Sequence, residues 1–172
     1  TNDIAVGLRT PLGEAERIKQ KYGCAVSSLV GEEDQLQVPS VGGRVSRSLP
    51  RKILSEIIEP RVEEIFALVG REIQLSGFED QIASGVVITG GTTSLDGMGD
   101  LAERVLDLPV RQGVPGGVGG LSDVVRPPKY ATGVGLVLFG GQADRTRKFK
   151  VRDDRLYDRI TVRMRSWFEE IF

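Results

Sequence analysis

The sequence contains no histidine and a single cysteine among its 172 residues. Without histidine, the chain has no imidazole to act as a general base, as a proton relay or as a zinc ligand. Cys24 has no second cysteine with which to form an intrachain disulfide, and we interpret it as a small buried apolar residue. The net charge of -1 gives no overall attraction toward nucleic acid, so we expect no nucleic-acid partner.

Long apolar segments are also missing. The longest apolar run, residues 134–139, contains a glycine and is far shorter than the roughly 20 residues that cross a bilayer. No secretory signal precedes the body of the chain, so we expect a cytoplasmic protein. With 40% apolar and 27% charged residues, the chain is long enough for one good core or for two small lobes. Its first residue is threonine rather than methionine, which makes it a candidate piece of a longer protein.

A strand-like segment followed by a glycine pair organises the chain. Residues 86–88 are apolar and predict the end of a buried strand, while Gly90 and Gly91 predict a tight turn with bare backbone. Residues 95–108 predict a helix, and residues 109–110 begin another extended segment. A loop at the carboxyl end of a strand is where open α/β sheets bind ligands. An ordinary strand-to-helix turn that needs glycine for its backbone angles is the alternative.

The amino-terminal part predicts two helices and a hairpin. The helices cover residues 2–8 and 11–22, and the hairpin covers residues 24–38 with an acidic turn between its strands. In the second helix, Glu16 and Lys19 lie one turn apart on one face. By itself this spacing indicates an exposed ion pair worth about 0.2–0.5 kcal/mol.

The middle of the chain carries its strongest helical period. Residues 41–48 predict an extended basic connector, and Ser48 is a plausible helix cap. The apolar spacing that follows predicts two amphipathic segments joined at Pro60. Because proline cannot donate to the helix ladder, we expect a kink there, or a break and a restart. Residues 74–80 predict a polar connection back to the glycine turn.

The segments after the glycine turn are less regular. The glycine-rich residues 112–120 predict a long loop. Residues 129–140 predict a short, nearly all-buried helix, whose small residues allow close packing against a sheet or a turn. Residues 144–152 are polar and basic, with little to bury, and predict a linker.

Residues 156–172 predict an amphipathic helix. From residue 144 onward there are nine Lys or Arg and six Asp or Glu, a net charge of +3 in a chain whose total is -1. An aromatic-rich amphipathic helix behind a basic tether is typical of a membrane-surface anchor. A helix that docks on its own domain or on a partner is the alternative. The residues that we expect to contact the membrane are Ile160, Met164, Trp167, Phe168 and Ile171.

Several short motifs occur together in one order, and this combination is far more specific than any single motif. They are TNDIA at 1–5, AERIKQKYGCA at 15–25, VPSVGGR at 38–44, IIEPR at 57–61 and VVITGGT at 86–92, followed by the proline-led YATGVGL at 130–136. Together they resemble the second half of an actin-like ATPase. More narrowly, with the aromatic amphipathic terminus, they resemble the FtsA family of bacterial cell-division proteins along essentially the whole chain.

The resemblance implies an α/β fold. It would be an actin-like (ribonuclease H-like) second domain with an inserted α+β subdomain, followed by a linker and a terminal amphipathic helix. The implied divisions are 1–23 for the first part of subdomain 2A, 24–80 for the inserted subdomain 2B, 81–141 for the return to 2A, 142–155 for a flexible basic linker and 156–172 for the membrane-targeting helix.

The resemblance also implies ATP as the cofactor, with Mg²⁺ in the full-length protein. In the family, the phosphate-binding hairpins and the residues that position the metal and water precede the point where this chain begins. The chain would cover the base and ribose side of the cleft, so we assign no catalytic or metal-binding residue to it and expect at most weak ATPase activity from the full-length protein. The expected nucleotide contacts are Glu16, Lys19, Gly90, Gly91 and Thr92.

The partners that the resemblance implies are other division proteins and the membrane surface. The protein would tether FtsZ filaments to the inner face of the cytoplasmic membrane at the division septum, form filaments itself and recruit later division proteins. An ATPase or kinase of the actin superfamily, or a pilus-assembly protein, is the alternative, although a soluble kinase has no use for the terminal helix. The carboxy-terminal peptide of FtsZ would bind the inserted subdomain through Arg44, Arg47, Arg51, Lys52 and Arg61.

Overall fold

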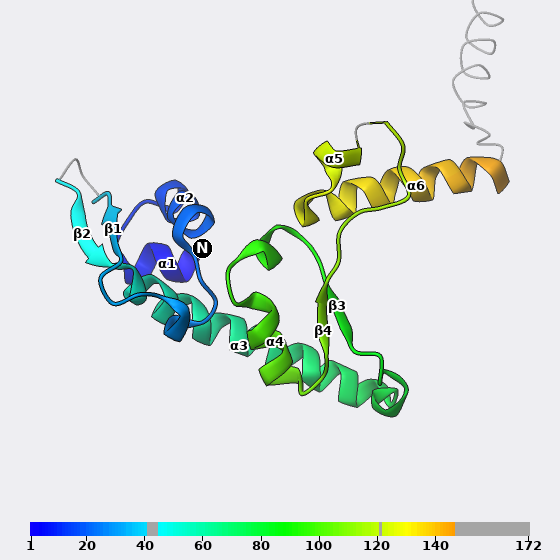
Figure 1. Ribbon diagram of the computed structural model, residues 1–172, viewed down its shortest axis with the longest axis horizontal. Coiled ribbons are helices and arrows are strands. Elements are labelled where there is room, and N and C mark those ends of the chain that lie inside the picture. The colour runs from blue at the N-terminus through cyan, green and yellow to red at the C-terminus, as the bar shows by residue number, and fades with distance from the viewer. Residues whose placement is uncertain (41–44, 121, 147–172) are drawn as a thin grey trace, which may run out of the picture. The chain divides into compact units, whose positions relative to one another are not determined.

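The computed structural model describes residues 1–40, 45–120 and 122–146 (Figure 1). The chain divides into two compact units, residues 1–134 and residues 135–172. The first unit contains the strands and the hydrophobic core, and within the second the described residues belong to a single helix. None of the helices in these described ranges combines the length and the apolar character needed to span a membrane.

Two short helices begin the chain, as the sequence predicts. They are α1 (Asn2–Gly7) and α2 (Leu12–Tyr22), and the α2 residues Ala15 and Ile18 are buried in the core. Pro11 stands at the start of α2 with extended backbone angles, and Gly23 ends the helix. Burial of one face of α2 leaves its opposite face, which carries the charged side chains, at the surface.

The hairpin predicted for residues 24–38 is wrong. Strand β1 (Gln35–Val38) pairs instead with β2 (Arg47–Pro50) in antiparallel register, and β2 occupies part of the segment predicted as a connector. Residues 24–26 are all buried and do not alternate between inside and outside. They make one bridge, from Cys24 to Asp96, and lead into a 3₁₀ turn, η1 (Ser27–Leu29). Contacts with a segment 72 positions away in sequence therefore replace the predicted local strand.

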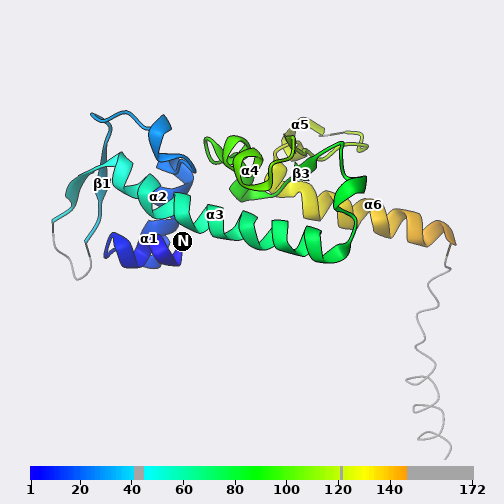
Figure 2. The same ribbon diagram turned by 90° about the horizontal axis from the view of Figure 1, so that it is seen from below.

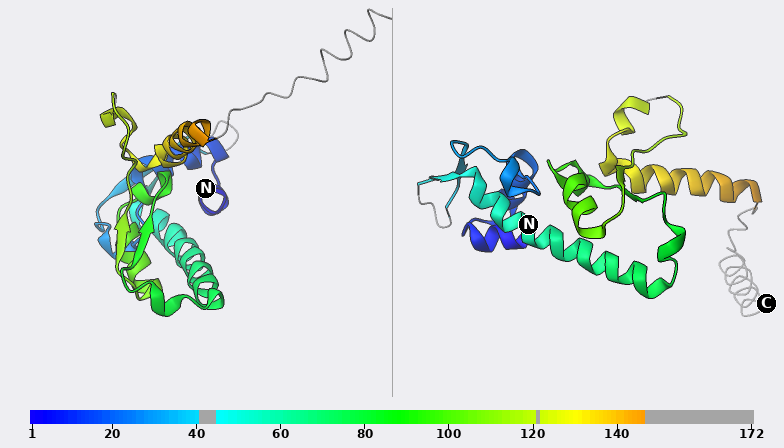
Figure 3. Two further views of the ribbon diagram at one scale, coloured as in Figure 1. Left: turned by 90° about the vertical axis from the view of Figure 1, so that its right-hand side faces the viewer. Right: turned by 60° about the horizontal axis from the view of Figure 1, so that its bottom comes forward.

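The long helix α3 (Arg51–Ser76) runs through Pro60 without ending, so the break and restart predicted there are wrong (Figure 3). The cap position belongs to Pro50 rather than Ser48, and the helix ends at Gly77, which has a positive φ of 71°. Tertiary packing explains the continuity, since one apolar face crosses the proline and is buried along its length. The buried side chains on that face are Leu54, Ile58, Val62 and Phe66.

Glu59, beside the proline, joins α3 to two other elements. Its carboxylate accepts hydrogen bonds from the Ser27 N–H at 2.8 Å and from Arg104 at 2.9 Å. Hydrogen bonding from Ser27, with a smaller contribution from Arg104, holds the pKa of Glu59 below its ordinary value. Glu59, on the polar side of α3, therefore has a structural role.

The glycine turn lies inside a parallel strand–helix–strand unit. Strand β3 (Val86–Ile88) pairs in parallel with β4 (Val110–Gln112), and α4 (Met98–Leu106) connects them, as the sequence predicts in outline. The prediction that this strand is buried is wrong, because Val87 is 53% exposed. The helix is shorter than predicted because left-handed residues, Gly97 and Asp107, stand at its two ends. Its buried face packs on α3, so α1, α2, β1, α3 and α4 share one core (Figure 2).

The segment after β4 is irregular over residues 113–120, as predicted, and then forms α5 (Ser122–Val125), η5 (Pro128–Tyr130) and α6 (Ala131–Thr146). The prediction of a nearly all-buried helix is wrong, because Leu136, Val137 and Phe139 are exposed. Burial needs a partner surface, and the described part of the second unit consists of this helix alone. The expected linker falls partly within α6, and the expected terminal helix lies outside the described residues.

Candidate functional site

A cleft of about 560 Å³ lies between α2 and the turn that follows β3. One wall comes from α2, the other from η4 (Gly91–Ser94), and the segment before α6 closes one side. Four of the five residues expected to contact a nucleotide line this cleft, and the fifth, Gly90, directly precedes η4. Its lining residues are Glu16, Lys19, Gln20, Gly91, Thr92, Ser94, Leu95, Pro127 and Lys129.

The glycine pair gives this cleft its bare wall. Gly90 has a φ of 104°, which side-chain-bearing residues rarely adopt, and it turns the chain from β3 into η4. At Gly91, a Cβ would lie 3.5 Å from the Lys129 Cβ, in ordinary van der Waals contact. The turn is held by Thr93, whose hydroxyl donates to the Gly90 carbonyl at 2.8 Å and whose own carbonyl accepts from the Gln112 amide at 2.6 Å.

The opposite wall carries a well-coordinated carboxylate. Glu16 accepts from Lys19 Nζ at 2.7 Å, from Gln20 Nε2 at 2.8 Å and from the Thr1 hydroxyl, and Lys19 also donates to the Thr1 oxygen at 2.9 Å. The Lys19 side chain is only 19% exposed. Hydrogen bonds from Lys19 and then Thr1 lower the pKa of Glu16 to about 2. The pair is therefore part of a four-residue network, and Glu16 stays ionised at neutral pH.

The expected nucleotide contacts leave out several residues that line the cleft. Gln20 could have been found, since it lies one helical turn beyond Glu16. Pro127 and Lys129 could not, because their position depends on how the irregular loop after β4 returns to η4. Lys129 brings a second ammonium group to the cleft, and its Nζ lies 4.9 Å from the centroid of the Tyr130 ring.

Three of the four arginines expected to bind a partner, Arg47, Arg51 and Arg61, make internal contacts. Arg47 donates to the Leu8 carbonyl, and Arg61 forms a two-pronged pair with Asp3, each N–O distance being 2.9 Å. This pairing, first through its hydrogen bonds, lowers the pKa of Asp3. Lys52 forms no ion pair with another described residue.

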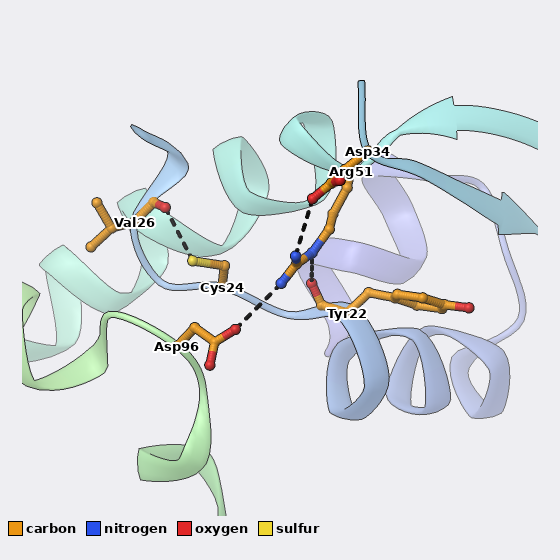
Figure 4. A network of polar contacts seen from close by, with 6 residues as sticks. All are labelled: Tyr22, Cys24, Val26, Asp34, Arg51 and Asp96. Atoms are coloured by element: carbon orange, nitrogen blue, oxygen red, sulfur yellow. Dashed lines mark hydrogen bonds and ion pairs between the residues drawn. The ribbon is translucent and has the colours of Figure 1, made fainter. Parts of the chain in front are cut away.

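Arg51 makes the most extensive contacts of the group (Figure 4). Its Nε donates to the Tyr22 carbonyl at 2.8 Å, and its two terminal nitrogens lie 3.3 Å from Asp34 and 3.4 Å from Asp96. Its side chain is 23% exposed. Arg44 and the expected membrane contacts Ile160, Met164, Trp167, Phe168 and Ile171 lie outside the described residues.

Comparison with known proteins identifies the family. The family model "Cell division protein FtsA" matches residues 1–135. The chain belongs to the FtsA family. A relative from Pseudomonas aeruginosa, named Cell division protein FtsA, is 52% identical over 142 residues, which is 83% of this chain and 34% of the relative.

Two further FtsA relatives match almost the whole chain. The protein from Escherichia coli K12 is 38% identical over 178 residues, 99% of this chain and 41% of its own length. The protein from Neisseria meningitidis serogroup B is 38% identical over 177 residues, 100% of this chain and 43% of its own length. The chain therefore spans about two fifths of the length of these FtsA relatives. The family implies an actin-like fold, and the described residues form a mixed α/β structure.

Proposed function

We propose that this chain is part of an actin-like division protein that tethers FtsZ filaments to the inner face of the cytoplasmic membrane at the division septum and recruits later division proteins. The match to the FtsA family over residues 1–135 carries this proposal. Three parts of the chain would contribute: the cleft between α2 and η4, the inserted segment 24–80, and the tail 156–172. We also propose that the assembled protein forms filaments, which would place many tails on one membrane.

The cleft is proposed to hold the adenosine part of ATP. Its volume of about 560 Å³ falls within the usual range for small-molecule sites, roughly 300–1,000 Å³. The ionised Glu16 could accept hydrogen bonds from the ribose hydroxyls, and the bare Gly91 backbone allows close approach of the nucleoside. When bound, the triphosphate and Mg²⁺ would supply the ATPase chemistry, and we assign no residue of this chain to that step.

The inserted segment is proposed to bind the carboxy-terminal peptide of FtsZ, which carries both apolar and acidic groups. Arg47, Arg51 and Arg61 already hold internal acceptors, so they would act mainly through the field they add to this surface. Lys52, without an ion pair to another described residue, is the group best suited to meet a peptide carboxylate directly. Lys52→Glu should weaken peptide binding and reduce its salt sensitivity. Arg17→Glu reverses the same charge on the exposed surface of α2 and should do neither.

The tail is proposed to become helical on an anionic membrane. Each fully buried apolar side chain contributes about 1.5–3 kcal/mol, while ordering a helix costs about 1–2 kcal/mol per residue. The net free energy of membrane binding for a single tail should therefore be small. Arginines of the tail are attracted to anionic lipid, but Glu169 and Glu170 oppose that attraction. Stable attachment would then need many tails on one filament, because linked weak sites bind with high avidity.

A segment exchange tests the proposed function. This chain replaces the matching segment of the Escherichia coli relative, and the exchanged protein is expressed in cells depleted of their own copy. We expect septation to recover and the purified protein to float with anionic liposomes. Loss of septation with a folded, ATP-binding exchanged protein would contradict the proposal.

The tail has its own matched control. Trp167→Glu with Phe168→Glu should reduce liposome recovery, as should truncation after Gly141. Val162 lies on the opposite side of the predicted helix, so Val162→Glu should leave recovery unchanged. Equal recovery for all of these variants would mean that the tail docks on protein rather than lipid.

A further inference from the structure

Arg51 stands where the two walls of the cleft meet. We infer that it is a positioning residue for nucleotide binding: it holds the end of α2 and the turn after β3 at the spacing that the nucleoside requires. The inference rests on the proposed adenosine site, and it assigns to Arg51 a role inside the protein in place of a direct role in partner binding.

Each wall reaches Arg51 through a different group. Tyr22, whose carbonyl accepts from Arg51 Nε at 2.8 Å, is the last residue of α2, the helix that presents Glu16 and Lys19. Asp96, whose carboxylate lies 3.4 Å from Arg51 Nη2, comes one residue after the cleft residue Leu95. Figure 4 shows the guanidinium lying between these two acceptors.

The backbone packs closely at the same junction. The Ala25 N–H donates to the Asp96 carbonyl at 2.8 Å, and Cys24 bridges to Asp96. A Cβ at Gly23 would collide with the Lys19 carbonyl of α2 and would lie 2.7 Å from the Leu95 Cδ2, so there is no room for a larger residue there. The walls therefore touch beneath the cleft, and Arg51 crosses that contact.

Only arginine suits this position. Its planar fork can donate in three directions at once, whereas the lysine ammonium is a point charge on a flexible stem. The carbonyl at the end of α2 also belongs to the negative end of the helix dipole, which favours a cation. Without the guanidinium, the Tyr22 carbonyl loses its donor, and the loop that ends at Asp96 keeps only its backbone contacts with residues 24 and 25. A misplaced wall then lowers affinity for the nucleoside without removing any group that touches it.

The third acceptor supplies an internal control. Asp34 lies 3.3 Å from Arg51 Nη1, almost the same distance as Asp96, but it belongs to the acidic turn before β1 and does not line the cleft. The side chains of Asp34 and Asp96 are 50% and 74% exposed, so replacing either by asparagine should leave the fold intact. Each variant weakens one ion pair of the same guanidinium, and only Asp96→Asn weakens the side-chain tie to a wall of the cleft.

The experiment uses the segment-exchanged protein described above, with a fluorescent ATP analogue as the probe. Asp96→Asn should weaken binding of the analogue about two- to fivefold, the range of an exposed ion pair, while Asp34→Asn leaves it unchanged. Arg51→Met should weaken it about tenfold or more, because it removes both ties, and Arg51→Lys should restore only part of the loss. Amide hydrogen exchange of residues 91–96 should be faster than in the parent only in Asp96→Asn and Arg51→Met. The urea unfolding midpoints of the two aspartate variants should be equal.

The outcomes separate the inference from the proposed function. Equal affinity losses in Asp34→Asn and Asp96→Asn, or unchanged exchange of residues 91–96 in Asp96→Asn, would overturn the positioning role. A parent protein that binds no analogue would overturn the adenosine site and with it the effect on affinity. In that case faster exchange in Asp96→Asn alone would still support Arg51 as the tie between the walls, and unchanged exchange would overturn that too.

Discussion

Glu16→Gln should destabilise the chain at neutral pH and lose its effect in acid. The substitution keeps the shape of the side chain and removes the charge that Lys19, Gln20 and Thr1 surround. Because 39% of the Glu16 side chain is exposed, water screens these contacts. We therefore expect a loss of about 1 kcal/mol in the free energy of unfolding at pH 7, the upper end for a partly exposed pair.

The pH dependence follows from the direction of the pKa shift. Folding lowers the pKa of Glu16 from 4.5 to about 2, so the folded state favours the ionised form. The contribution of Glu16 to the free energy of unfolding is complete above about pH 5 and is lost as the pH falls from about 4.5 toward 2. The parent and Glu16→Gln should therefore differ most in stability at pH 7 and by much less at pH 2.5.

Urea unfolding of the full chain, followed by far-ultraviolet circular dichroism at pH 7, 5 and 2.5, measures this difference. Glu14→Gln on the same helix is the matched control, because it removes a carboxylate paired at 2.7 Å with Arg17, whose side chain is 79% exposed. That variant should cost less than about 0.5 kcal/mol at pH 7. The reasoning would be refuted if Glu16→Gln matched Glu14→Gln, or if its effect at pH 2.5 were as large as its effect at pH 7.

Four further predictions concern the core and the cleft. Leu54→Ala, at a fully buried position on α3, should lower the free energy of unfolding by about 2–5 kcal/mol in urea titrations. At the neighbouring Ser55, whose buried hydroxyl has no hydrogen-bond partner among the described residues, alanine should be neutral or stabilising in the same assay, and a loss above about 1 kcal/mol would contradict this. Gly91→Val should fold normally but abolish binding of a fluorescent ATP analogue by the segment-exchanged protein, with Gly13→Ala on open α2 surface as the control. The chain by itself should bind that analogue weakly or not at all, because phosphate groups usually supply most of the anchoring, and micromolar affinity would contradict this.

The sequence predicted only part of the candidate site. The resemblance to the FtsA family pointed to Glu16 and Lys19 on one helix and to the glycine pair more than 70 positions later. Neither periodicity nor spacing indicated that the two would line one cleft, because that depends on a core shared by α2, α3 and α4. Lys129 and the Arg51 junction had no local signal at all.

Local patterns by themselves determined α1, α2, β3, the glycine turn and the irregular loop after β4. Each of these depends on the period of its own side chains or on glycine backbone freedom, and both can be seen within about ten residues. Tertiary structure alone decided that β1 pairs with β2, that α3 continues through Pro60, and that Arg51 ties the end of α2 to Asp96. These features depend on contacts between residues that are distant in sequence, and burial of a shared apolar face can outweigh a local preference such as that of proline against helix.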